Sequence, residues 1–163
     1  MPTTLTSLAT VVDPQHAVRV DVVTGTRFKM TFDTADGGDH RAGASPTEAV
    51  LAALAGCTSM DVGAILRKKR QAPDSYRIAV TGEKRDDHPQ VYTSIVIEHQ
   101  VAGEVEPEAL RRAIELSATT YCPVSAMLSC SVRIEHRYRL TGRAGDEVSA
   151  LVSVTGPEGT AVH

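Results

Sequence analysis

The residues of this chain best suited to chemistry are three cysteines, Cys57, Cys122 and Cys130. A cysteine thiolate can attack an electrophile, form a disulfide or bind a soft metal ion. An odd, sparse set of cysteines does not make the disulfide framework of a small secreted protein. We therefore expect core packing, catalysis or redox sensing, and a cytoplasmic location in which thiols stay reduced.

Cys122 precedes Pro123, which suits the first position of a helix, so Cys122 is predicted to be the N-cap of a short helix over 123–129. Unpaired N–H groups and the positive end of the helix dipole would then favour a thiolate at this residue. The alternative is that a small residue simply precedes a proline. Cys130 closes the same segment and is predicted to pack in the core.

Cys57 lies within a predicted helix, directly after Gly56. A glycine in a helix interior costs about 1 kcal/mol relative to alanine. Such a cost indicates that another backbone or a ligand comes close, and the alternative is a small thiol packed at a helix–helix contact.

A metal site built from Cys57, Cys122 and a histidine would need ligands from distant segments. No two cysteines have Cys-x-x-Cys spacing, and no histidine lies within five residues of Cys57 or Cys122. His99 and His136 fall on apolar strand faces, where hydrogen-bonded core histidines are expected rather than ligands. We therefore expect no bound metal or cofactor.

Hydrophobic periodicity predicts the elements that position these cysteines. A long helix should begin at Pro46, because Ser45 and Glu48 have the spacing of a capping box. The predicted helices cover 46–70, 106–121 and 123–129, and the predicted strands cover 5–12, 18–23, 28–33, 76–80, 91–101 and 132–140.

This order of elements, joined mainly by short links, indicates an α+β fold with mostly antiparallel sheets. The helix is apolar or small on every side from Ala49 to Cys57, so it should be buried all round. One small sheet cannot supply that cover, which favours a homodimer. Residues 1–140 are predicted to form a single domain, and 141–163 a tail or a peripheral strand.

Composition excludes several classes of protein. The chain has 163 residues, 42% hydrophobic and 23% charged, as is typical of a folded soluble domain. A net charge of −3 and the absence of tryptophan argue against a nucleic-acid partner. The N-terminus does not have the pattern of a signal peptide, and the longest uncharged apolar stretch, 49–60, is too short to span a membrane.

Three motifs resemble the OsmC/Ohr family (osmotically induced protein C and organic hydroperoxide resistance). They are Ser45-Pro46-Thr47-Glu48, then Ala52-Ala53-Leu54-Ala55-Gly56-Cys57-Thr58, then Tyr121-Cys122-Pro123-Val124-Ser125. The resemblance covers residues 8–140 and agrees with the predicted order of elements.

The resemblance implies an intertwined homodimer that reduces organic hydroperoxides in defence against oxidative stress. Cys57 would match the peroxidatic cysteine and Cys122 the resolving cysteine. A sulfenic acid on the first would condense with the second to a disulfide, which an external dithiol donor would reduce.

One motif departs from the family pattern. Active members carry Asn-Pro-Glu at the start of the central helix, and this glutamate pairs with an arginine beside the peroxidatic thiolate. Here Thr47 stands in place of the glutamate, and Arg19 and Arg27 are the candidate arginines. The pattern is closer to the OsmC-like branch, so the alternative function is non-catalytic binding of a small molecule, or redox sensing through a Cys57–Cys122 disulfide.

Overall fold

The computed structural model describes residues 3–12, 19–33 and 41–157. The chain divides into two compact units, residues 1–50 and residues 51–163, which are treated separately below.

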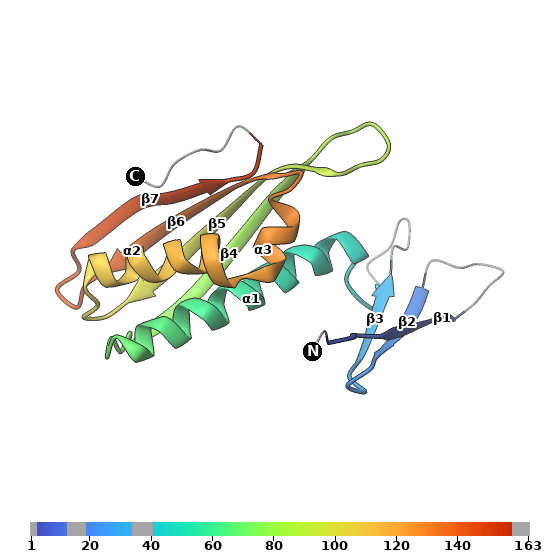
Figure 1. The fold of residues 1–163 in the computed structure, drawn as a ribbon, viewed down its shortest axis with the longest axis horizontal. Helices are drawn as coiled ribbons and strands as arrows, with labels where there is room; N and C mark the ends of the chain where they lie inside the picture. The colour runs from blue at the N-terminus through green and yellow to red at the C-terminus, as the bar shows by residue number, and fades with distance from the viewer. Residues whose placement is uncertain (1–2, 13–18, 34–40, 158–163) are drawn as a thin grey trace. The chain divides into compact units, whose positions relative to one another are not determined.

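The N-terminal unit is a three-stranded antiparallel sheet in the order β1-β2-β3 (Figure 1). Its strands are β1 (Ser7–Val11), β2 (Arg19–Thr24) and β3 (Lys29–Asp33). Alternating and β-branched residues predict all three strands. A turn that begins at Thr24-Gly25 joins β2 to β3, and in it the Arg27 N–H donates to the Thr24 carbonyl oxygen at 2.8 Å.

The helix α1 (Pro46–Lys68) begins at the predicted capping box. The Ser45 backbone N–H donates to Glu48 Oε2 at 2.8 Å, and the Glu48 N–H donates to Ser45 Oγ at 3.3 Å. The box satisfies N–H groups that have no partner inside the helix. At 23 residues, α1 is also long and apolar enough to cross a bilayer by length and composition alone, a property that core helices of soluble proteins share.

A single chain does not bury α1 on all sides, in line with the expectation that one small sheet cannot cover this helix. Its buried residues form one stripe at four-residue spacing, Leu54, Thr58, Val62 and Leu66. Ala52, Ala53, Gly56 and Met60 are exposed on other faces. The elements of one chain therefore cover a single stripe of this helix.

The C-terminal unit contains a four-stranded sheet in the order β4-β5-β6-β7. The strands are β4 (Ser75–Lys84), β5 (Tyr92–Ala102), β6 (Arg133–Thr141) and β7 (Glu147–Thr155). β7 pairs with β6 along an edge of the sheet, so residues 147–155 form a peripheral strand. The expectation of mostly antiparallel pairing is confirmed, and among the described strands β5 and β6 form the one parallel pair. The helical connection between them returns the chain to the same end of the sheet.

That connection consists of α2 (Pro107–Leu116), a π-helical turn η1 (Ser117–Tyr121) and α3 (Pro123–Leu128). The predicted single α-helix over 106–121 is therefore corrected in its last five residues. In the wider turn, the Cys122 N–H donates to the Ser117 carbonyl oxygen at 3.0 Å, five residues back. Such π turns are rare and often occur at functional sites.

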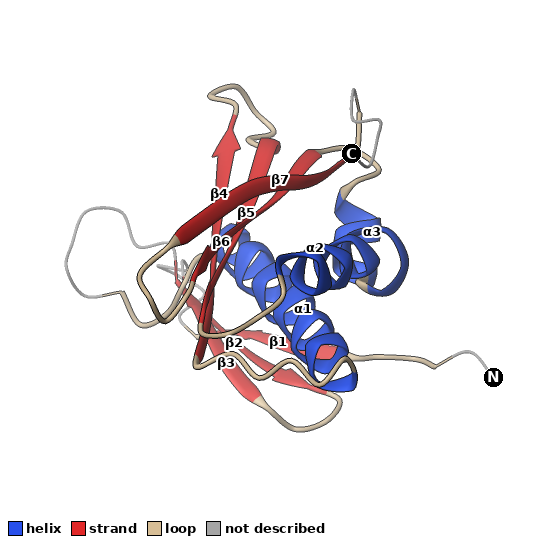
Figure 2. Cartoon of the chain, turned by 90° about the vertical axis from the view of Figure 1, so that its left-hand side faces the viewer, coloured by secondary structure: helices blue, strands red, loops and turns tan. Residues whose placement is uncertain are grey.

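The helices of this unit lie on one face of the sheet (Figure 2). The buried core forms two clusters. One joins α1 and α2 to the sheet around Val62, Leu66 and Ile114. The other surrounds Leu54, Ile95 and Ile134, contains Cys122, and packs against Cys57. The two cysteines singled out from the sequence therefore share one apolar cluster.

Candidate functional site

Cys57 and Cys122 are brought together from two elements 65 positions apart in the chain. Cys57 lies on α1, and Cys122 lies at the junction between η1 and α3. Their sulfur atoms, with an oxygen of Asp61, all lie within 4.8 Å of one another. Both thiols are free; Cys57 is half-buried and Cys122 is only 3% exposed. A small molecule from solvent therefore reaches Cys57 more readily than Cys122.

Cys122 is the N-cap of α3, as its position before Pro123 predicts. The Ser125 N–H donates to its sulfur at 3.3 Å. The hydroxyl of Thr58, fully buried on α1, donates to the same sulfur at 3.6 Å. These two hydrogen bonds fix the position of the Cys122 sulfur between α1 and the start of α3.

Cys57 has a different environment. Burial, followed by the hydrogen bond with Cys122 and the charges of Cys122 and Asp61, raises the pKa of its thiol to about 11. A hydrogen bond from the Val124 backbone opposes them. Neither side chain that acts on this pKa is cationic. Cys57, the accessible thiol, therefore keeps its proton at neutral pH.

Asp61 is the third residue of the group, and it was not identified from the sequence. Ser117, in the π-helical turn, donates from Oγ to Asp61 Oδ2 at 3.2 Å. The signal that could have revealed Asp61 is its spacing, since it lies four residues after Cys57 and therefore on the same face of α1. Two thiol sulfurs and a carboxylate at this spacing are suited to hold a soft metal ion.

The prediction that Cys130 packs in the core is wrong. It is exposed, and its thiol donates to the Ala126 carbonyl oxygen at 3.4 Å. Cys130 lies in the turn between α3 and β6, outside both elements, and its side chain is exposed there.

His99 and His136 are fully buried, as their strand faces predict, but the expected hydrogen bonds are incomplete. His99 Nδ1 and the Tyr76 hydroxyl form a hydrogen bond at 2.7 Å. His99 Nε2 and both ring nitrogens of His136 are buried without a partner among the described residues. Neither histidine belongs to the group around Cys57, in which the third residue is Asp61.

The residues that differ from the peroxidase pattern lie in the N-terminal unit. Thr47 lies in the first turn of α1, where its hydroxyl is 3.3 Å from Ser45 Oγ, and Glu48 serves the capping box. Arg19 pairs with Asp21 at 3.8 Å, and Arg27 has a positive φ of 68° after the β2–β3 turn.

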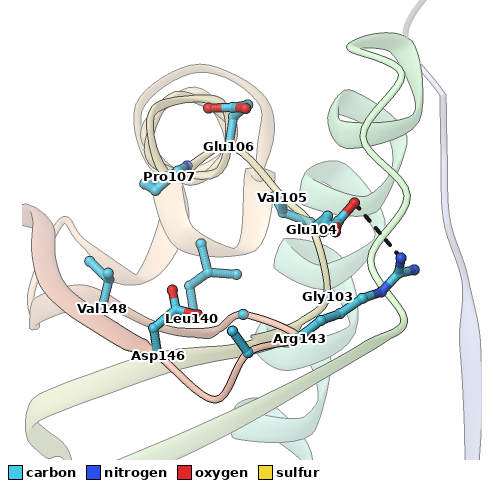
Figure 3. Close-up of a pocket in the computed structure, with 11 residues that line it drawn as sticks. Gly103, Glu104, Val105, Glu106, Pro107, Leu140, Arg143, Asp146 and Val148 are labelled. Carbon is cyan, nitrogen blue, oxygen red and sulfur yellow. Dashed lines mark ion pairs between the residues drawn. The ribbon is translucent and has the colours of Figure 1, made fainter.

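A separate cavity of about 430 Å³ lies between the loop 103–107 and the turn 140–148 (Figure 3). Arg143 at its edge pairs with Glu104 at 3.7 Å and with Asp74 at 2.8 Å. Its lining has no thiol, so the candidate chemistry stays with Cys57 and Cys122.

Comparison with known proteins decides the family. Residues 36–137, which include both cysteines, match the model of the OsmC-like protein family. The chain belongs to the OsmC-like family. It is 38% identical over 106 residues to the protein YhfA of Escherichia coli strain K12, an alignment that covers 64% of this chain and 79% of YhfA.

Solved structures of other proteins share the fold. A hypothetical protein from Aquifex aeolicus VF5 superimposes with a TM-score of 0.76 at 26% identity, over 87% of this chain and 99% of that protein. An organic hydroperoxide resistance protein OsmC from Legionella pneumophila superimposes with a TM-score of 0.62 at 12% identity, over 82% and 95% of the two chains. The predicted α+β fold class is confirmed, and at 12% identity the likeness concerns the fold alone.

Proposed function

We propose that this OsmC-like protein reduces organic hydroperoxides with Cys57 and Cys122. The observation that carries the proposal is the placement of the two sulfurs within 4.8 Å of each other, one accessible and one buried, in an apolar cluster. Membership of a family that includes an organic hydroperoxide resistance protein supports it.

The accessible sulfur takes the first step. Cys57 attacks the outer peroxide oxygen, the O–O bond breaks, and the departing alkoxide takes up the thiol proton to leave as an alcohol. Cys57 becomes a sulfenic acid. The sulfur of Cys122 then attacks the sulfur of Cys57, the S–O bond breaks, and hydroxide leaves as water with the proton of Cys122. The product is a Cys57–Cys122 disulfide.

The buried sulfur is prepared for the second step. The hydrogen bonds from Ser125 and Thr58 hold Cys122 facing Cys57 and support its negative charge during attack. The disulfide must be reduced by an external dithiol, which a reducing cytoplasm would provide.

Apolar neighbours favour an organic substrate. Leu54 is buried beside the cysteines, and Leu51, Val80 and Val124 are partly buried around the same cluster. An alkyl or aryl hydroperoxide gains about 0.8 kcal/mol for each CH₂ group that it buries, and hydrogen peroxide has none to bury.

A homodimer belongs to the same proposal. In the single chain, large apolar side chains are exposed on β1 (Leu8 at 70%), in the β2–β3 connection (Phe28 at 72%) and on α1 (Met60 at 76%). Large exposed apolar surfaces mark interaction sites, and a second copy would supply cover for them.

The deciding experiment is steady-state reduction of cumene hydroperoxide and hydrogen peroxide, with dithiothreitol or a lipoylated protein as the donor. We expect turnover with the organic peroxide, none in Cys57→Ser, and a single stalled turnover in Cys122→Ser. Cys130→Ser is the matched control and should keep full activity. Equal loss of activity in all three variants would contradict the proposal.

Redox sensing is the second candidate, and Thr47, in place of the glutamate that the family pattern places beside the peroxidatic cysteine, is the observation that favours it. A sensor would form the Cys57–Cys122 disulfide once with peroxide and show no turnover with either donor. Peptide mapping without reduction, run beside the kinetic assay, separates the two functions.

A further inference from the structure

We propose that the reduced protein binds one soft divalent cation, best matched by Zn²⁺, through Cys57 Sγ, Asp61 and Cys122 Sγ. This metal site goes beyond the proposed peroxidase function and does not depend on it. It follows from the ligand atoms that the fold gathers and from the chemistry of those atoms.

The three ligand atoms are close enough for one ion. They lie within 4.8 Å of one another. Around a tetrahedral Zn²⁺, with Zn–S of about 2.3 Å and Zn–O of about 2.1 Å, neighbouring ligand atoms are about 3.6–3.8 Å apart. Side-chain movements of about 1 Å would bring the group to that geometry.

The backbone already directs the ligands toward a common point. Cys57 and Asp61 project from the same face of α1, one turn apart, as in the helical ligand pairs of many metal sites. Cys122 approaches from the N-terminus of α3 and is fixed there by the Ser125 N–H. The three ligands therefore come from two rigid elements of one unit.

Outer hydrogen bonds orient two of the ligands. Ser117 donates to Asp61 Oδ2 at 3.2 Å, and Thr58 donates to Cys122 Sγ at 3.6 Å. Such second contacts orient ligands and typically change metal affinity by about 10- to 100-fold.

The donor set selects the type of metal. Two thiolates favour soft or borderline ions such as Zn²⁺ and Co²⁺ over Mg²⁺ or Ca²⁺, which prefer oxygen ligands alone. Cys57 and Asp61 are both half-buried, so an ion can enter from solvent and keep a water as its fourth ligand.

Metal binding and disulfide formation exclude each other, because both use the same two sulfurs. A bound cation would protect Cys57 from peroxide until the metal is removed. This regulatory consequence rests on the proposed function; the binding itself does not.

The test is a titration of the reduced, metal-free, full-length protein with Co²⁺ under anaerobic conditions. We expect one Co²⁺ per chain, a thiolate-to-cobalt charge-transfer band in the near ultraviolet, visible bands of tetrahedral cobalt, and displacement by one equivalent of Zn²⁺. The oxidised wild-type protein, with the Cys57–Cys122 disulfide, is a control that requires no mutation, and it should give none of these signals.

Variants test each ligand. Asp61→Asn should retain the charge-transfer band and bind Co²⁺ at least about tenfold more weakly. Cys57→Ser and Cys122→Ser should each lose at least half of the band, and Cys130→Ser should match the wild type. Unchanged affinity in Asp61→Asn, loss of the band in Cys130→Ser, or no binding by the reduced wild type at millimolar Co²⁺ would each overturn the proposal. Peroxidase assays on metal-free protein report on the proposed function separately.

Discussion

At the residue scale, the two thiols of the site have opposite environments. Cys122 accepts hydrogen bonds from Ser125 and Thr58. The pKa of Cys57 is raised by burial, by Cys122 and by Asp61. The family pattern places an arginine–glutamate pair beside the peroxidatic thiolate, and Thr47 replaces that glutamate here. The accessible thiol, Cys57, thus has a raised pKa and no cation beside it among the groups that act on it, which predicts slow chemistry at neutral pH.

The pH dependence of the reaction follows from Cys57. With its pKa raised to about 11, only about one molecule in ten thousand carries the Cys57 thiolate at pH 7. We expect the rate of Cys57 alkylation by iodoacetamide, measured in Cys130→Ser protein by peptide mapping, to rise steadily from pH 7 to pH 10. A rate that is already constant between pH 6 and pH 8 would show that a cation activates this thiol.

Asp61 gives a second prediction at this scale. Its negative charge disfavours the Cys57 thiolate, so Asp61→Asn should lower the pKa of Cys57 and speed alkylation severalfold at pH 8. Glu83→Gln, on the exposed β4 strand, is the matched control and should alkylate at the wild-type rate. A slower reaction in Asp61→Asn would mean that the carboxylate assists proton removal instead.

At the scale of the elements, β5 and β6 bury two histidines side by side. Burial lowers the pKa of His99 to about 3, with a further contribution from His136, and burial lowers that of His136 to about 4. The ring centroids are 6.5 Å apart and stacked. Between about pH 4 and pH 6.5, both side chains are therefore neutral in the folded protein, whereas the same histidines bind protons in the unfolded chain.

This pairing predicts acid sensitivity. The pKa values of these histidines are lower in the folded state than the unfolded value of about 6.5, so their contribution to stability is complete above pH 6.5 and is lost as the pH falls toward 4. Each histidine adds a slope of at most about 1.4 kcal/mol per pH unit. Urea unfolding between pH 7 and pH 4.5 should show a shallower slope in His136→Leu than in the wild type. His88→Gln, in the exposed β4–β5 turn, should leave the slope unchanged.

At the scale of the whole molecule, exposed apolar surface is the main unexplained feature of the single chain. Leu8 on β1, Phe28 in the β2–β3 connection and Met60 on α1 are each at least 70% exposed. A monomer would leave this surface in water, at a cost of about 25 cal/mol for each Å² of apolar area. A dimer that buries it should therefore be obligate.

The dimer prediction is tested by sedimentation. At low micromolar concentration we expect a species of twice 17.4 kDa. Met60→Glu should shift the equilibrium toward monomer by at least about tenfold, because it places a charge on a surface that the dimer would bury. Leu151→Glu, on the edge strand β7 where Leu151 is 48% exposed, is the control. A folded wild-type monomer at that concentration would refute the obligate dimer.

The sequence by itself determined the local features of this protein. Alternating residues identified β1, β2 and β3, the Ser45–Glu48 spacing located the start of α1, and the Cys122-Pro123 pair identified an N-cap. These features depend on interactions within a few residues, so short-range rules suffice. The motifs around Cys57 and Cys122 were specific enough to indicate the family.

Only the tertiary structure decided what depends on distant contacts. Parallel pairing of β5 with β6, the π-helical turn before Cys122 and the exposure of Cys130 all depend on how the helical connection packs on the sheet. The same packing brings Asp61 beside two sulfurs, one of which is 61 positions away in the sequence. A spacing of four residues shows that Asp61 and Cys57 share a face of α1, but only the fold shows that this face meets Cys122, because contact between distant segments is set by their packing and not by their own periodicity.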